Sequence, residues 1–169
     1  MNDAVDQPHQ RPSWDDYFLS LVREVSKRAT CNRGRSGCLI VKDKRIVCTG
    51  YVGSPPGIEH CDEVGHLMKR VMDDAGDVKM HCTRTIHAEQ NAICQAARYG
   101  IPLEGTTLYC TMEPCRTCAM LIASVGIARV VAMKRYHAGQ DTQALFERAG
   151  IVLDVVDEAT ETYAGQAPP

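Results

Sequence analysis

The sequence predicts an α/β fold, a three-layer α/β/α sandwich built around a five-stranded mixed sheet. The first supporting observation is size, because 169 residues suit one compact domain with a substantial core. The second is an early pair of β-branched runs joined by a short connection, which indicates a β-hairpin. The third is the later alternation of helical and strand patterns, which is typical of α/β architectures.

The first part of the chain contains one predicted helix and the predicted hairpin. The helix covers residues 14–28, with Ser13 as a plausible N-cap, and its apolar residues recur at helical spacing. These residues are Tyr17, Phe18, Leu21, Val22 and Val25. The strands are expected at Cys38–Val41 and Arg45–Tyr51. Gly53–Gly57, which contains two prolines, then reads as a loop.

A long polar insertion, Glu59–Thr85, separates the hairpin from the next helix. A short helix is expected within it at Glu63–Asp73. Its density of Asp, Lys, His and Cys indicates a surface loop or a segment organised by a metal. A loop of this length is costly to order unless something fixes it.

The second half alternates regularly between helices and strands. Gly100 and Pro102 end the first of these helices, and Gly126 ends the second. The predicted helices are His87–Tyr99, Cys115–Val125 and Thr142–Ala149, and the predicted strands are Thr106–Met112, Arg129–Met133 and Ile151–Val156. The domain is therefore expected to span 14–156, between a flexible N-terminal tail at 1–13 and a C-terminal tail at 157–169.

The chemical motif is His87-Ala88-Glu89 followed by Pro114-Cys115-Arg116-Thr117-Cys118. One imidazole and two thiolates give three ligands to a tetrahedral Zn²⁺ and leave the fourth position for water, as catalytic zinc requires. Glu89 is not needed for coordination and is free to carry protons. A bare C-x-x-C would equally suit a redox pair or half of a structural site, but the upstream H-x-E favours the arrangement of zinc-dependent nucleobase deaminases.

Other stretches extend this motif into a resemblance that covers roughly residues 14–156. The chain resembles the cytidine deaminase superfamily and, within it, the deoxycytidylate (dCMP) deaminases of bacteria and phages. The segment from Gly50 to Arg84 narrows the match to the dCMP deaminases. The matching stretches are Trp14–Phe18, Cys31–Arg33, Gly37–Val41, Thr49–Pro55, His81–Ile86, Leu108–Thr111 and Gly126–Ile127.

The resemblance implies hydrolysis of dCMP to dUMP with release of ammonia. Water activated by zinc would attack C4 of the cytosine ring, while Glu89 moves its proton to N3 and then to the leaving ammonia. The resemblance also implies a cytidine deaminase-like sandwich and a homohexamer. It further implies dCTP and dTTP as allosteric effectors at the loop around Gly53 and Gly57, with Mg²⁺ accompanying dCTP.

A second, structural zinc site is carried by many of the dCMP deaminases that this chain resembles. By position, Cys31 and Cys61 are the best matches, and His66 and Cys82 are the next choices. His81 or His60 could replace one of them. The alternative is a set of free surface thiols and imidazoles. Four further cysteines, namely Cys38, Cys48, Cys94 and Cys110, lie in apolar patterns and are expected in the core.

Substrate contacts are predicted on the loops around the pocket. A mononucleotide phosphate calls for charge-assisted donors, and Arg33, Arg35 and Arg84 are the candidates. Tyr136 is expected to form part of the pocket wall. Related enzymes have asparagine against the sugar where this chain has Val52, so a 5-substituted dCMP or another nucleotide or nucleobase stays open as the substrate. Ser36 likewise replaces the usual valine.

Composition separates the remaining classes of function. A formal charge of −2 without a basic stripe makes nucleic acid an unlikely partner. This argues against the runner-up, a tRNA adenosine deaminase, as does the insertion. A non-catalytic, zinc-stabilised regulatory subunit is disfavoured because Glu89 and an open ligand position are both kept. Nine cysteines, an odd count, without an apolar leader or membrane-length run predict a cytoplasmic protein with reduced thiols.

Overall fold

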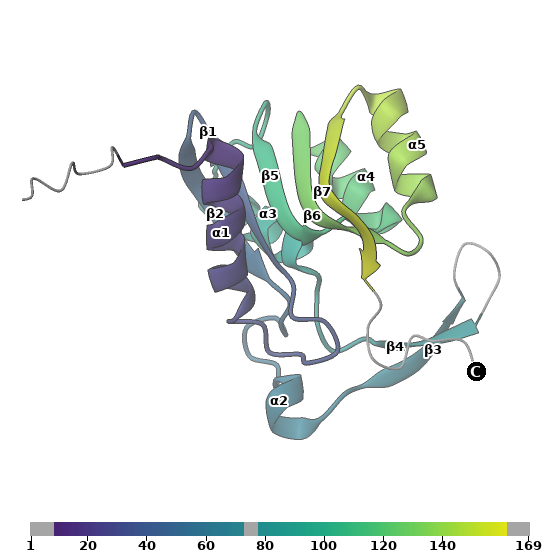
Figure 1. Cartoon of the computed structure of the whole chain (residues 1–169). Coiled ribbons are helices and arrows are strands. Elements are labelled where there is room, and N and C mark those ends of the chain that lie inside the picture. Colours follow the sequence, from purple (N-terminus) through teal and green to yellow (C-terminus); the bar gives the residue numbers. More distant parts are fainter. Residues whose placement is uncertain (1–8, 73–77, 162–169) are drawn as a thin grey trace, which may run out of the picture.

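A computed structural model describes residues 9–72 and 78–161 (Figure 1). Its core is a five-stranded sheet of order β2-β1-β5-β6-β7. β1 runs antiparallel to both β2 and β5, whereas β5, β6 and β7 are mutually parallel, so the sheet is mixed as predicted. The strands are β1 (Gly37–Lys42), β2 (Arg45–Tyr51), β5 (Thr107–Met112), β6 (Arg129–Tyr136) and β7 (Val152–Glu161).

Helices cover both faces of this sheet, which gives the predicted three layers. α1 (Trp14–Ser26) lies on one face, where Phe18, Leu19 and Val22 pack against buried residues of β1, β5 and β6. The other face holds the larger apolar cluster and is covered by three helices (Figure 1). These are α3 (Ala88–Tyr99), α4 (Arg116–Ser124) and α5 (Gln140–Ala149). The burial of both sheet faces explains why β1 is apolar along almost its whole length.

Three of the four cysteines assigned to the core are buried, namely Cys38, Cys48 and Cys110. The prediction was wrong for Cys94, which is exposed on α3. Its helix buries Ala92, Ile93 and Ala96 instead, so Cys94 falls on the solvent side of the helical repeat.

The insertion differs from its prediction. Instead of a helix over Glu63–Asp73, it has one helical turn, α2 (Cys61–Val64), followed by a two-stranded ribbon of β3 (Met68–Met72) and β4 (Val78–Cys82). Gly65, with a φ of 82°, ends α2 before it can continue. The ribbon stands apart from the main sheet (Figure 1). Because most of its side chains are exposed, it lacks the apolar periodicity that predicts strands.

The last two strands are longer than predicted. β6 continues to Tyr136 and β7 to Glu161, with Arg135 paired to Thr160 and Tyr136 paired to Glu161. Residues 157–161 are therefore strand and not tail, while 1–8 and 162–169 of the predicted tails lie outside the described residues. This extension is polar and has no apolar alternation, so the hydrophobic pattern does not predict a strand there. Backbone pairing with β6 holds it, assisted by a 2.8 Å bond from Arg135 to Glu158.

Every helix among residues 9–72 and 78–161 is too short or too polar to cross a membrane.

Candidate active site and second metal centre

Two helix starts bring the predicted catalytic ligands together. His87 is the N-cap of α3 and Cys115 is the N-cap of α4, while Cys118 lies in the first turn of α4. The Sγ atoms of Cys115 and Cys118 lie 3.5 and 3.4 Å from His87 Nδ1. Tetrahedral zinc with ordinary bond lengths separates its nitrogen and sulfur ligands by about 3.6 Å. The three donors therefore fit one zinc ion, and the helix N-termini favour thiolates there.

Charge is already separated within this group of ligands. Hydrogen bonds with Cys118 and His87 lower the pKa of the Cys115 thiol to about 4, against the opposing effect of burial. The hydrogen bond to Cys115 raises the pKa of His87 to about 9, again against burial. The hydrogen bond with Cys115, together with burial, raises the pKa of Cys118. The protons on His87 and Cys118 thus lie where a metal cation would bind, and metal binding would displace them.

Glu89 lies beside these ligands and is almost completely buried, with 7% of its surface exposed. Burial raises the pKa of its carboxyl, and the neighbouring His87 partly opposes that effect. A buried carboxyl group beside candidate metal ligands, with a pKa above its ordinary value, is suited to accept and return protons.

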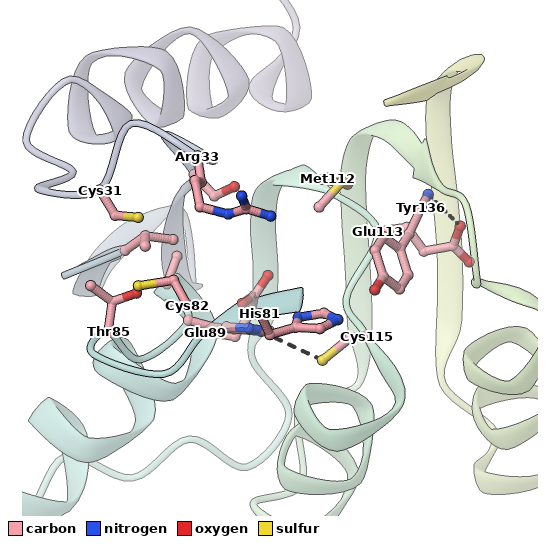
Figure 2. A pocket seen from close by; sticks show the side chains of 15 residues that line it. Cys31, Arg33, His81, Cys82, Thr85, Glu89, Met112, Glu113, Cys115 and Tyr136 are labelled. Atoms are coloured by element: carbon pink, nitrogen blue, oxygen red, sulfur yellow. Dashed lines mark hydrogen bonds between the residues drawn. The ribbon is translucent and has the colours of Figure 1, made fainter. Parts of the chain in front are cut away.

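A pocket opens directly above the ligands. Its walls include Glu89, Cys115 and Tyr136, with Arg33 across from Tyr136 (Figure 2). Val52 also lines the pocket. The remaining lining residues are Cys31, Gly34, Ser36, His81, Cys82, Thr85, His87, Ala88, Met112 and Glu113. A small heterocycle placed here would contact both the metal ligands and the buried carboxylate.

Only one of the three arginines predicted to bind phosphate lines this pocket. Arg33 does, and it also donates a 3.3 Å hydrogen bond to the backbone carbonyl of Met80 on β4. Arg35 instead donates to the Ala29 carbonyl at 2.6 Å and lies 3.6 Å from an Asp62 carboxylate oxygen. The Arg35 side chain therefore links the loop after α1 to α2 and does not face the pocket.

Arg84 is also outside the pocket lining. Its Nη1 lies 3.5 Å from a carboxylate oxygen of Glu59, and its side chain is only 17% exposed. The two arginines were predicted at the pocket because they lie in loops next to it and match basic positions in related deaminases. Sequence distance could not show that both face the base of the insertion.

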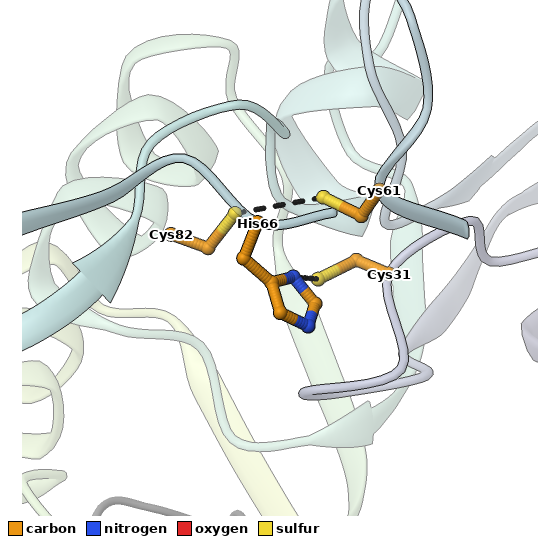
Figure 3. A group of neighbouring side chains, drawn as sticks. All are labelled: Cys31, Cys61, His66 and Cys82. Atoms are coloured by element: carbon orange, nitrogen blue, oxygen red, sulfur yellow. Dashed lines mark hydrogen bonds between the residues drawn. The ribbon is translucent and has the colours of Figure 1, made fainter. Parts of the chain in front are cut away.

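A second group of ligands gathers at the base of the insertion, at the positions chosen from the sequence. Cys31, Cys61, His66 and Cys82 place their donor atoms within 4.8 Å of one another (Figure 3). The Cys31 sulfur lies 3.7 Å from His66 Nδ1, and the sulfurs of Cys61 and Cys82 are 3.5 Å apart. Four such ligands closing on one point are typical of a structural zinc site.

The thiols of this group have unequal acidities. Burial and the hydrogen bond with Cys82 raise the pKa of Cys61 to about 12. Burial also acts to raise the pKa of Cys82, but the backbone N–H of Arg84 and the Cys61 thiol outweigh it and lower that pKa. As at the first site, protons are shared between sulfur atoms. A bound divalent cation would displace these protons and balance the charge of the thiolates.

The proposed substitute ligands fall elsewhere. His81 lines the pocket, one residue before Cys82, and His60 is the N-cap of α2. Glu113 was missed by the sequence reasoning, although it is a buried acid directly before Pro114 and Cys115. A glutamate adjoining a metal motif is a usable signal, but only the fold shows what it contacts.

A histidine, two cysteines and a buried glutamate around one pocket define a zinc-binding deaminase type of site. Residues 12–134 match the family described as the cytidine and deoxycytidylate deaminase zinc-binding region. The chain belongs to this family.

Its relatives include proteins from bacteria, phages and yeast. The chain is 40% identical to ComE operon protein 2 of Bacillus subtilis, and the match covers 88% of this chain and 74% of the relative. Similarity to the deoxycytidylate deaminase of Mycobacterium phage D29 is 40% over 73% of this chain and 97% of the relative. The deoxycytidylate deaminase of Saccharomyces cerevisiae is 34% identical over 86% of this chain, which spans 46% of that longer protein.

The fold matches solved structures of the same kind. The dCMP deaminase of cyanophage S-TIM5, in complex with dCMP and dUMP, superposes with a TM-score of 0.67 at 23% identity, covering 87% of this chain and 99% of that one. The likeness places the five-stranded sheet and its helices in the cytidine deaminase-like fold.

Proposed function

We propose that the protein hydrolyses dCMP to dUMP and ammonia. The observation that carries the proposal is the convergence of His87, Cys115 and Cys118 beside the buried Glu89 at the floor of one pocket. The deoxycytidylate deaminases among its relatives support the choice of substrate.

The three ligands fit zinc, and the bound ion would supply an acidified water as the nucleophile. The remaining steps are proton transfers by Glu89. Its carboxylate accepts a proton from the attacking water, delivers it to ring N3, and then carries the proton of the new C4 hydroxyl to the leaving amino group as the C4 carbonyl forms. One carboxylate serves all three steps because they occur in sequence, and its burial keeps bulk water from competing for the proton.

The pocket wall suggests how the nucleotide is held. Arg33 is the cationic side chain on the lining, so we assign it to the phosphate. Tyr136 would flank the base or sugar from the opposite wall, and Val52 would pack against the sugar. Arg35 and Arg84 are not assigned to substrate because their cationic groups face carboxylates at the base of the insertion.

Val52 keeps a second substrate in consideration. It lines the pocket and packs against the main core, and its isopropyl group has no hydrogen-bonding atom. An apolar wall cannot select between substrates by hydrogen bonding, as a buried polar side chain would. A 5-substituted dCMP, or another nucleotide or nucleobase, is therefore the alternative that we retain.

The function is tested by ammonia release from dCMP, 5-methyl-dCMP, deoxycytidine, guanine and tRNA. We expect kcat/KM for dCMP to exceed that for deoxycytidine by at least about 100-fold, because a charged phosphate contact is lost without the nucleotide. Preference for 5-methyl-dCMP would favour the alternative. Turnover of tRNA or guanine with none of dCMP would reject the proposal.

The second ligand group is proposed to hold a structural zinc that fixes the insertion. Cys31 comes from the loop after α1 and Cys61 from α2, while His66 and Cys82 lie at the same end of the ribbon, before β3 and at the end of β4. A bound ion would therefore tie together segments that share little hydrophobic core. Such a closed site would have no open position for substrate.

Replacing Cys61 by serine tests this second site. We expect metal content to fall from about two to about one zinc per chain, because a four-ligand structural site does not tolerate a lost thiolate. The melting temperature should fall as well, since binding energy at such a site is folding energy. Cys94→Ser, an exposed thiol on α3, is the matched control and should keep both ions. One zinc in the wild-type protein would contradict the site.

Assembly and regulation are proposed from the relatives' family. We expect a cytoplasmic homohexamer with dCTP, accompanied by Mg²⁺, as activator and dTTP as inhibitor. Exposed apolar side chains such as Met120 and Leu121 of α4 are compatible with burial against another copy. Light scattering after size exclusion measures the assembly, and substrate saturation curves with and without each effector measure the regulation.

A further inference from the structure

A buried acid that the proposed chemistry does not use lies at the end of β5. Glu113 is 1% exposed, although glutamate is seldom buried without partners. One carboxylate oxygen accepts a 3.3 Å hydrogen bond from the backbone N–H of Tyr136, and the other accepts a 3.0 Å bond from the Gln143 side chain. Arg135 lies 3.7 Å from the same carboxylate. All three partners are donors, as the carboxylate form requires.

These partners flank the turn that leads from β6 into α5, because Arg135 and Tyr136 end the strand and Gln143 lies in the first turn of the helix. Gly139, the N-cap of α5, packs so closely on the carboxylate that a Cβ there would lie 2.5 Å from Glu113 Oε2. The φ of Gly139 is −78°, which any residue can adopt, so the glycine is needed here for space alone. The turn from Tyr136 to Gly139 is therefore wrapped around the Glu113 carboxylate.

The same turn carries a wall of the pocket. Tyr136 supplies its N–H to Glu113 and its side chain to the pocket lining, across from Arg33 (Figure 2). A shift of this turn would change the width of the pocket at the wall of Tyr136. The start of α5 also contacts the start of α4, because Thr142 donates a 2.9 Å hydrogen bond to the Pro114 carbonyl beside Cys115, so zinc content has to be measured together with KM.

We propose that Glu113 is a positioning residue, which holds Tyr136 at the pocket wall and so sets the affinity for the nucleotide. The inference rests on the proposed function. Because the carboxylate acts on the binding wall and not on Glu89 or the metal ligands, its loss should change KM far more than kcat.

The test is Glu113→Gln. Glutamine has the same shape but brings an NH2 group to a place where the partners donate, and it removes the charge facing Arg135. We expect KM for dCMP to rise about tenfold, the effect of losing one charge-assisted hydrogen bond, with kcat within about threefold of wild type. Zinc content should be unchanged.

Two other variants sharpen the result. Gly139→Ala pushes the turn away from an intact Glu113 and should raise KM in the same way, which keeps the test available if Glu113→Gln does not fold. Glu158→Gln removes the exposed partner of Arg135 and is the matched control, with KM expected to stay at the wild-type value. An unchanged KM in Glu113→Gln or Gly139→Ala would overturn the proposal. So would loss of zinc from Glu113→Gln, because Glu113 would then act through Cys115.

Hydrogen exchange separates this inference from the proposed function. Peptides covering 136–143 should exchange faster in Glu113→Gln than in wild type or Glu158→Gln, whatever the substrate is. If wild type does not turn over dCMP, the function fails while the exchange result still tests the turn. Equal exchange in all three proteins would overturn the positioning role.

Discussion

Replacing Glu89 by glutamine is expected to reduce kcat for dCMP by about 10²–10⁴-fold, the usual contribution of a positioned general acid–base. Glutamine fills the same buried space but can neither accept the proton of the attacking water nor return one to N3 and the amino group. Because the amide is neutral, burial penalises it less than an ionised carboxylate, and the fold should be kept. The measurements are steady-state kinetics, zinc content and circular dichroism.

The control for this prediction is Glu147→Gln, an exposed glutamate of α5. It changes the net charge equally and should leave kcat unchanged. Turnover by Glu89→Gln within tenfold of wild type, with zinc present, would remove Glu89 from the proton-transfer role. Loss of zinc from the variant would instead place the carboxylate among the ligands.

Replacing Cys118 by serine should abolish activity through loss of metal. Cys118 is fully buried and lies 3.4 Å from His87 Nδ1, so no other described cysteine can take its place without moving α4. A serine hydroxyl is a poor zinc ligand at neutral pH because the thiolate is the form that binds. We expect about one zinc equivalent to be lost and kcat/KM to fall at least about 10³-fold.

Metal removal from the wild type gives the matching experiment. A chelator should abolish turnover, and added Zn²⁺ should restore it in wild type but not in Cys118→Ser. Cys94→Ser again serves as the cysteine control. Full activity of wild-type protein stripped of zinc would contradict a hydrolytic metal centre.

The parts of the fold that obey a simple periodicity could be predicted from the sequence. The helices at Ala88–Tyr99 and Arg116–Ser124 have apolar residues at helical spacing and end at glycines, and their predicted bounds agree within about one residue of the observed ones. The grouping of His87, Cys115 and Cys118 was predictable because zinc coordination favours these side chains at this spacing, whereas the second group was predicted by position from the family resemblance. The ribbon of β3 and β4 was not predictable, because it stands apart from the core and its side chains carry no burial pattern.

The residues that line the wall of the pocket could not be predicted from the sequence for a different reason. Arg33, Arg35 and Arg84 are the same residue type and all lie in loops, yet of these three only Arg33 lines the pocket. Arg35 and Arg84 instead face acidic residues of the insertion, namely Asp62 and Glu59. Such pairings depend on tertiary contacts between distant loops, and one sequence does not specify them. Glu113 belongs to the same class, since its partners follow it by more than twenty positions.

The order of the chain has a consequence for how the enzyme matures. His87 precedes β5 and the two cysteines follow it, and β5 is the central strand, paired on one side to β1 and on the other to β6. The nitrogen and sulfur donors are therefore separated in the chain by a strand that pairs with neighbours on both sides. Non-local pairing of this kind is slow to form. Catalytic competence should therefore appear late during refolding, after most helical signal has returned, and zinc uptake should report the closing of the sheet.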